Sequence, residues 1–157
     1  MVIIGFDPGL SHTGYAVLNK EGNNINFVQC GLISPKRNKS LSERLFIIFS
    51  ETNKLIEDFN PNLVVIENVF YGKNVQSAIK LGQAKASIML SSEKYNVDMV
   101  DYTPREIKQS IVGNGAASKE QVEFMVKKIF KLDPYITYIT MGLVNRDTQV
   151  LKVWLYR

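Results

Sequence analysis

The sequence has little cysteine, little histidine and no long apolar run. Its 157 residues include a single cysteine, Cys30, so an internal disulfide framework is excluded. No stretch approaches the roughly 20 consecutive apolar residues of a membrane-spanning helix. The N-terminus also lacks a basic segment ahead of a long apolar stretch. We therefore expect no signal peptide, no membrane partner and a cytoplasmic location.

Neither sign of charge dominates the chain. It carries 19 lysines and arginines against 15 aspartates and glutamates, a formal net charge of +4. This mild excess allows a polyanionic partner without requiring one. The length suits one domain of ordinary size, and the sequence shows no repeat, linker or low-complexity segment. These features favour a single domain over residues 1–157.

The pattern of apolar residues predicts an α/β fold. Short β-branched runs separated by Gly and Asn turns predict three antiparallel strands at the start of the chain. Further on, short apolar runs alternate with segments of helical spacing, which predicts parallel strands and helices on the faces of a mixed sheet. The predicted strands are residues 2–6, 14–18, 25–33, 63–67 and 97–102, and the predicted helices are residues 40–59 and 75–95, a helix capped by Thr103, and residues 118–130.

Two carboxylates end apolar strands in the same way. Asp7 follows the run VIIGF and Glu67 follows LVVI. If the two strands are neighbours, the carboxylates converge at one edge of the sheet, where a cation would offset their repulsion and desolvation. Oxygen ligands of this type suit Mg²⁺ or Mn²⁺. The alternatives are that Asp7-Pro8-Gly9 is simply a turn and that Glu67 lies exposed on a bent edge.

Four segments together resemble the RuvC family of Holliday-junction resolvases. In chain order they read IIGFDPGLSHTGYAV, VIENVFYGKNVQSAIKLGQA, YTPREIKQSIVGNGAASKEQV and FMVKKIFKL, and the resemblance runs from Met1 to about Leu132. It implies an RNase H-like fold, a five-stranded mixed sheet flanked by helices. It also implies a homodimer that cuts four-way DNA junctions by two symmetric, Mg²⁺-dependent nicks in recombination and repair. Family members work beside a branch-migration motor.

The resemblance assigns roles to the two strand-end carboxylates. Asp7 and Glu67 match the first two metal-binding and catalytic carboxylates of the family. In such enzymes two metal ions activate the attacking water and stabilise the leaving oxygen of the phosphodiester. The resemblance therefore selects the metal interpretation of Asp7, with Pro8 and Gly9 turning the chain so that backbone can approach a phosphate.

The resemblance also implies a DNA-contacting surface. Phe70 matches an aromatic that stacks on bases of the opened junction, a contact worth roughly 1–3 kcal/mol, although a core residue that anchors its loop is the alternative. Lys108 and Lys119 match lysines that contact DNA, and we expect Arg105 and Lys73 to belong to the same surface. Ordinary solvated surface side chains are the alternative for these basic residues.

The helix predicted over residues 75–95 leaves two questions open. Lys80 and Lys85 either extend the phosphate-binding surface or line the solvated side of the helix. Small residues permit a close approach of this helix to another element. That approach suits a two-fold dimer contact and equally suits packing of the helix on its own sheet. These small residues are Ala78, Gly82, Ala86 and Ser87.

The resemblance breaks in the tail, residues 133–157. The last helix of the family carries two further carboxylates three residues apart, but an ungapped match places Ile139 and Gly142 there, and neither can bind a metal. A reading-frame change near residue 135 and natural divergence both account for this tail. Asp147 either supplies a third metal ligand or caps a short terminal helix.

Two functions follow from these residues. The first is a structure-selective endonuclease that resolves four-way junctions. The second is a junction-binding protein with weak or no cleavage, because the C-terminal carboxylates are missing. A magnesium site that orients both a water and a phosphodiester normally draws on several carboxylates. We therefore expect the chain as written to bind junctions and to cleave them poorly.

Overall fold

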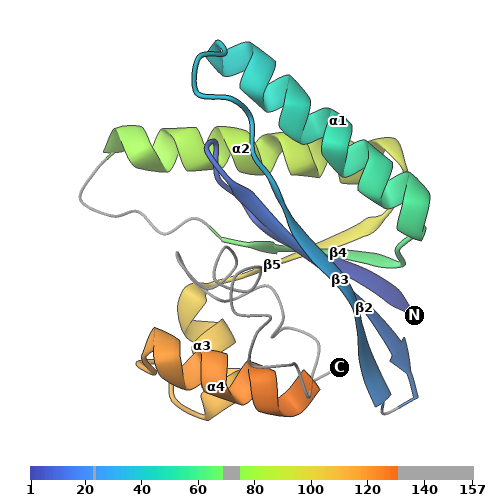
Figure 1. The fold of residues 1–157 in the computed structure, drawn as a ribbon, viewed down its shortest axis with the longest axis vertical. Coiled ribbons are helices and arrows are strands. Elements are labelled where there is room, and N and C mark those ends of the chain that lie inside the picture. Colours follow the sequence, from blue (N-terminus) through green and yellow to red (C-terminus); the bar gives the residue numbers. More distant parts are fainter. Residues whose placement is uncertain (23, 69–74, 131–157) are drawn as a thin grey trace.

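The computed structural model describes residues 1–22, 24–68 and 75–130, which form a five-stranded mixed sheet flanked by helices (Figure 1). Across the sheet the strand order is β3-β2-β1-β4-β5. Among the described residues, none of the helices combines the length and apolar character needed to cross a bilayer. In chain order the elements are β1 (Val2–Asp7), β2 (Thr13–Glu21), β3 (Asn24–Ile33), α1 (Leu41–Phe59), β4 (Leu63–Glu67), α2 (Val75–Lys94), β5 (Asp98–Tyr102), α3 (Pro104–Val112) and α4 (Lys119–Phe130).

The sheet combines an antiparallel half with a parallel half. β2 pairs antiparallel with β1 and β3, whereas β4 pairs parallel with β1 and β5. The predicted meander and the predicted α/β fold class are thus confirmed. β2 continues beyond the predicted Leu18 as far as Glu21, because its polar end still pairs with the start of β3. Gly22 then turns the chain with a φ of 59°.

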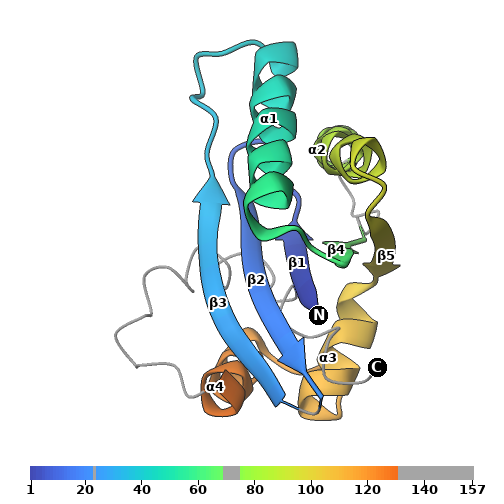
Figure 2. The same cartoon turned by 90° about the vertical axis from the view of Figure 1, so that its right-hand side faces the viewer.

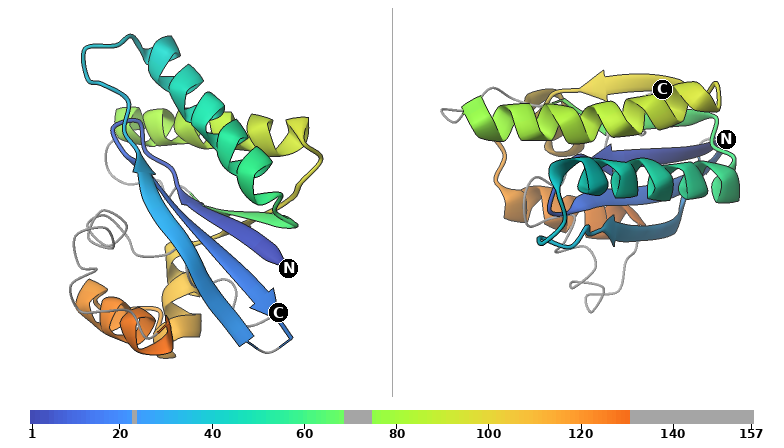
Figure 3. Two further views of the ribbon diagram at one scale, coloured as in Figure 1. Left: turned by 45° about the vertical axis from the view of Figure 1, so that its right-hand side comes forward. Right: turned by 90° about the horizontal axis from the view of Figure 1, so that it is seen from above.

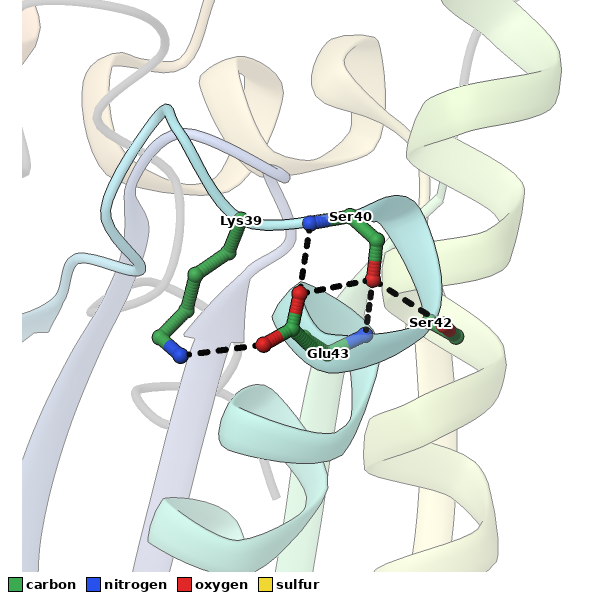
Figure 4. A network of polar contacts seen from close by, with 4 residues as sticks. All are labelled: Lys39, Ser40, Ser42 and Glu43. Carbon is green, nitrogen blue, oxygen red and sulfur yellow. Dashed lines mark hydrogen bonds and ion pairs between the residues drawn. The ribbon is translucent and has the colours of Figure 1, made fainter.

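Helices α1 and α3 begin at capping boxes, and Ser118 and Gln121 exchange the same two hydrogen bonds at the start of α4. Ser40 Oγ accepts a hydrogen bond from the Glu43 amide, and the Glu43 carboxylate accepts one from the Ser40 amide (Figure 4). The hydrogen bonds from Ser40, followed by the ammonium of Lys39, lower the pKa of Glu43 to about 2. Thr103 and Glu106 repeat this arrangement at the start of α3, which confirms the predicted cap.

Side chains of each strand alternate between two apolar clusters, one on each face of the sheet. Phe6 and Ile66 belong to the cluster that packs under α1 and α2, whereas Ile3 and Val65 belong to the cluster that packs under α3 and α4. In Figures 1 and 2 the α1–α2 pair lies in the upper part of the view and the α3–α4 pair in the lower part. Seen from above, α1 and α2 lie side by side (Figure 3).

Candidate functional site

Asp7 and Glu67 end neighbouring parallel strands. In the ladder between β1 and β4, Phe6 pairs with Ile66, and each carboxylate is the next residue of its strand. Parallel strands bring their carboxyl ends to the same edge of a sheet, about 4.8 Å apart. The expected neighbourhood of the two strands is therefore confirmed, and it brings both carboxylates to one edge.

Both carboxylates also lie on one face of the sheet. Phe6 and Ile66 contribute to the cluster under α1 and α2, so the side chains that follow them alternate to the opposite face. That face is the one on which Ile3 and Val65 pack with α3 and α4. The site therefore belongs to the α3–α4 face, whereas its strands are anchored on the other face by apolar side chains.

The surroundings decide between the alternatives for these two residues. Glu67 is only 8% exposed, and its strand β4 lies between β1 and β5. The alternative of an exposed carboxylate on a bent edge is therefore wrong. Asp7 is half-buried and forms the last position of β1, so it is more than a turn residue.

A tight loop follows Asp7. The Gly9 amide donates to Thr13 Oγ1 at 3.2 Å, and the Thr13 hydroxyl donates back to the Gly9 carbonyl at 2.8 Å. A Cβ added to Gly9 would lie 2.4 Å from the carbonyl oxygen of His12, so only glycine fits here without moving backbone. Thr13 itself is fully buried. The loop thus fixes the chain directly beyond the Asp7 carboxylate.

The donor chemistry suits a hard divalent cation. Two carboxylates that share an edge and a face supply the oxygen ligands that Mg²⁺ and Mn²⁺ prefer. Within the described ranges, no group of three or more histidine, cysteine, aspartate or glutamate side chains is arranged to hold a metal. The candidate third ligand, Asp147, lies outside the described residues, as do Ile139 and Gly142.

The expected DNA-contacting residues are only partly described. Arg105 is exposed and Lys108 half-buried, and the two lie three residues apart on α3. Lys119 is the first residue of α4, but the structure does not describe its side chain. Phe70 and Lys73 lie outside the described residues. The helices that carry Arg105, Lys108 and Lys119 cover the same face of the sheet to which Asp7 and Glu67 point.

The two lysines of α2 that the sequence could not tell apart, Lys80 and Lys85, have different surroundings in the structure. Lys80 is exposed, whereas the Lys85 side chain is only 12% exposed and contacts Asn68 and Asp101. The interpretation of Lys85 as a solvated side chain is therefore wrong. The sequence alone does not indicate a role for Asn68 or Asp101, because only the packing of β4, β5 and α2 brings both residues to Lys85.

The small residues of α2 divide in the same way. Ser87 is buried, and its hydroxyl donates to the Gln83 carbonyl. Gly82 and Ala86 are exposed, and a Cβ added to Gly82 would meet no atom within 4 Å. Packing within the described chain thus accounts for Ser87, whereas Gly82 and Ala86 lie on the outer side of the helix.

Comparisons with known proteins agree with this architecture. The family model for crossover junction endodeoxyribonuclease RuvC matches residues 3–142. Crossover junction endodeoxyribonuclease RuvC of Dictyoglomus thermophilum is 42% identical over 132 residues, which cover 84% of this chain and 84% of the relative. The solved structure of Thermus thermophilus RuvC is 26% identical, with a TM-score of 0.84 over 99% of this chain and 95% of that one.

A second solved structure, T. thermophilus RuvC in complex with Holliday junction substrate, is 25% identical, with a TM-score of 0.86 over 99% of this chain and 94% of that chain. The match over residues 3–142 includes the ends of β1 and β4, where Asp7 and Glu67 lie. The chain belongs to the RuvC family of crossover junction endodeoxyribonucleases.

Proposed function

We propose that this chain is a structure-selective endonuclease that binds four-way DNA junctions and resolves them by two symmetric, metal-dependent nicks. The observation that carries the proposal is the register between β1 and β4, which brings Asp7 and Glu67 to one edge and one face. Membership of the RuvC family supports the reaction. The T. thermophilus relative in complex with Holliday junction substrate supports the substrate.

Asp7 and Glu67 would hold Mg²⁺, for which Mn²⁺ can substitute. When bound, the metal supplies an activated water and stabilises the leaving oxygen of the phosphodiester. The chain itself holds the two carboxylates on adjacent strand ends and keeps Glu67 nearly out of solvent. Two carboxylates on adjacent strand ends supply the oxygen ligands that a hard divalent cation prefers, and this supports metal binding at the pair.

The DNA backbone would lie along α3 and the start of α4. Arg105, Lys108 and Lys119 are proposed to contact phosphates, with Lys73 extending that surface and Phe70 stacking on an unpaired base. Phosphate contacts release counterions, so binding should weaken with salt and depend little on sequence. Lys108→Ala and Lys119→Ala should each lower the salt slope by about one unit. An unchanged slope in both variants would make these lysines ordinary surface residues.

We propose that two copies of the chain associate through the outer side of α2. Val75, Ile79 and Leu90 are 70%, 57% and 63% exposed. Gly82 and Ala86 lie between them at helical spacing, so another helix can approach closely. Two symmetric nicks require two copies of one site, which a two-fold dimer supplies.

The dimer is tested by placing a charge on this side of α2. Ile79→Glu should convert the dimer to monomer in sedimentation experiments at micromolar concentration. Phe124→Glu, which changes a similarly exposed apolar side chain on α4, should leave the dimer intact. A chain that is monomeric before any substitution, with and without junction DNA, would contradict the proposal. We also propose a cytoplasmic location, and the family resemblance supports a branch-migration motor as a further partner.

A second function is favoured by one specific observation. Ile139 and Gly142 stand where an ungapped match places the last two carboxylates of the family, so the chain can bind junctions and yet cleave them weakly. Ile139→Asp combined with Gly142→Asp should then raise Mg²⁺-dependent nicking, because the resemblance implies a last helix here, and residues three apart on a helix share one face. Efficient nicking by the unmodified chain that Asp147→Asn abolishes would make Asp147 the third ligand.

One titration separates the candidate functions. The unmodified chain is titrated with a four-way junction and with linear duplex of the same sequence, with and without Mg²⁺, and both binding and paired nicking are measured. Selective binding with Mg²⁺-dependent paired nicks supports the endonuclease. Selective binding without nicks supports the junction-binding protein, and equal affinity for junction and linear duplex contradicts both.

A further inference from the structure

A nearly buried lysine joins three elements next to Glu67. Lys85 Nζ, from α2, lies 2.5 Å from Asp101 Oδ2 on β5 and 3.2 Å from Asn68 Oδ1 at the end of β4. The Lys85 side chain is 12% exposed and that of Asp101 is 37% exposed. Protein therefore covers most of the Lys85 side chain, and its ammonium contacts one carboxylate and one amide oxygen.

Asn68 is held twice at this point. Its side-chain oxygen accepts the hydrogen bond from Lys85, and its backbone amide donates to the Tyr102 carbonyl at 2.8 Å. Because Asn68 directly follows Glu67, the end of β4 is fixed both to β5 and to α2. The distance between this anchor and the candidate metal ligand is a single peptide unit.

The anchor lies on the face opposite to the site. Asp101 pairs with Ile66 in the ladder between β4 and β5, and Ile66 packs under α1 and α2. Glu67 points to the other face, so Lys85 acts behind the carboxylate and not within the site. The contacts of Lys85 with Asp101 and Asn68, on the face opposite to α3 and α4, favour an anchoring role over phosphate binding.

The ion pair between Lys85 and Asp101 differs from other ion pairs of the described chain in the elements that it joins. Lys54 pairs with Glu51, and Lys127 pairs with Glu123, in each case within one helix. Such pairs support their own helix by a few tenths of a kcal/mol. The pair of Lys85 with Asp101 instead joins a helix to a strand and also holds the residue beyond Glu67.

We infer that Lys85 is a positioning residue: through Asn68 it fixes the end of β4, so that the Glu67 carboxylate meets Asp7 around one metal ion. The inference rests on the proposed function, because it assumes that Asp7 and Glu67 bind a metal. Groups that orient metal ligands from behind commonly change metal affinity by 10- to 100-fold when they are removed. Lys85 would act on Glu67 through Asn68, the next residue along the chain.

The test begins with the DNA-free chain and needs no catalysis. Lys85→Met removes the anchor but leaves the Asp101 carboxylate without its lysine. Lys85→Met combined with Asp101→Leu removes that carboxylate too, so the double variant should keep its fold. Lys127→Met is the matched control, because it removes a similarly paired lysine from α4. In both Lys85 variants the Asn68 amide should exchange with solvent about tenfold faster or more relative to the Val65 amide. The control should leave that ratio unchanged.

Mn²⁺ binding is then measured by calorimetry on the same proteins. Both Lys85 variants should bind Mn²⁺ about 10- to 100-fold more weakly, Lys85→Arg should retain most of the affinity, and Lys127→Met should bind as the unmodified chain does. Unchanged Asn68 exchange, or unchanged Mn²⁺ affinity in the double variant, would overturn the inference and leave the proposed function standing. Failure of the unmodified chain to bind Mn²⁺ would overturn the proposed metal site and the inference together.

Discussion

The two faces of the sheet use neighbouring residues of the same strands for different purposes. Under α1 and α2, Phe6 and Ile66 are fully buried in an apolar cluster. One residue further along each strand, Asp7 and Glu67 point to the face of α3 and α4. One face therefore holds the strands in register, and the other carries the proposed chemistry. Because side chains alternate, a shift of register by one residue would exchange the two roles.

Substitution of Asp7 or Glu67 should give the largest effect, a loss of nicking without a loss of junction affinity or stability. Asp7→Asn and Glu67→Gln should each lower junction nicking by about 10³-fold or more, roughly 4 kcal/mol of transition-state stabilisation, because each removes a metal ligand. Junction affinity in the absence of metal should remain, and thermal stability should stay equal or rise as carboxylate repulsion is relieved. Single-turnover nicking and thermal unfolding measure the two effects. A large loss of stability in either variant would assign the carboxylates to the fold.

Substitution of Ile66, the residue before Glu67, should lower stability and leave metal binding almost unchanged. Ile66→Ala should lower the free energy of unfolding by about 2–5 kcal/mol, because it leaves a cavity in the cluster under α1 and α2. Mn²⁺ affinity of the folded fraction should change far less. Denaturant unfolding and calorimetry at a temperature where the variant is folded provide the comparison. Loss of Mn²⁺ binding without loss of stability would contradict the division between the faces.

The capping boxes of α1 and α3 offer a matched pair of smaller changes. Ser40→Ala and Thr103→Ala each remove an N-cap, and each should cost about 1 kcal/mol of stability. Only Thr103→Ala should also weaken junction binding, because it loosens the start of the helix that carries Arg105 and Lys108. Thermal unfolding and junction titration separate the two results. Equal losses of junction affinity would show that both faces contribute to binding.

The smallest expected effect is a change in how the stability of the chain depends on acid pH, through Glu43. The hydrogen bonds from Ser40, together with Lys39, lower the folded-state pKa of Glu43 from 4.5 to about 2. A lowered pKa adds stability above the unfolded-state value, and that stability is lost as the pH falls through the folded-state value. Glu43→Gln should therefore reduce stability at neutral pH, and the difference from the unmodified chain should vanish between about pH 4.5 and 2. Thermal unfolding across this range is the measurement, and a difference that persists at pH 2 would contradict it.

The fold could be predicted from the sequence because its signals are local. Alternation of apolar residues marks the strands, and Thr103 with Pro104 marks the start of α3. The strand-end positions of Asp7 and Glu67 follow from the same runs. The anchor at Lys85 could not be predicted, because Asn68 and Asp101 come from two other segments. In the sequence, Lys85 resembles a solvated lysine such as Lys80, and only pairing of β4 with β5 brings its two acceptors together.

The pairing of β1 with β4 also orders events in the assembly of the chain. β1, β2 and β3 are consecutive and can form their meander as soon as they leave the ribosome. In contrast, the Val2 amide donates to Asn62 Oδ1, sixty residues further along the chain. Contacts between such distant residues carry a larger loop-closure cost and form slowly. A partly synthesised chain thus holds Asp7 without Glu67, and nuclease competence is delayed until synthesis has passed β4.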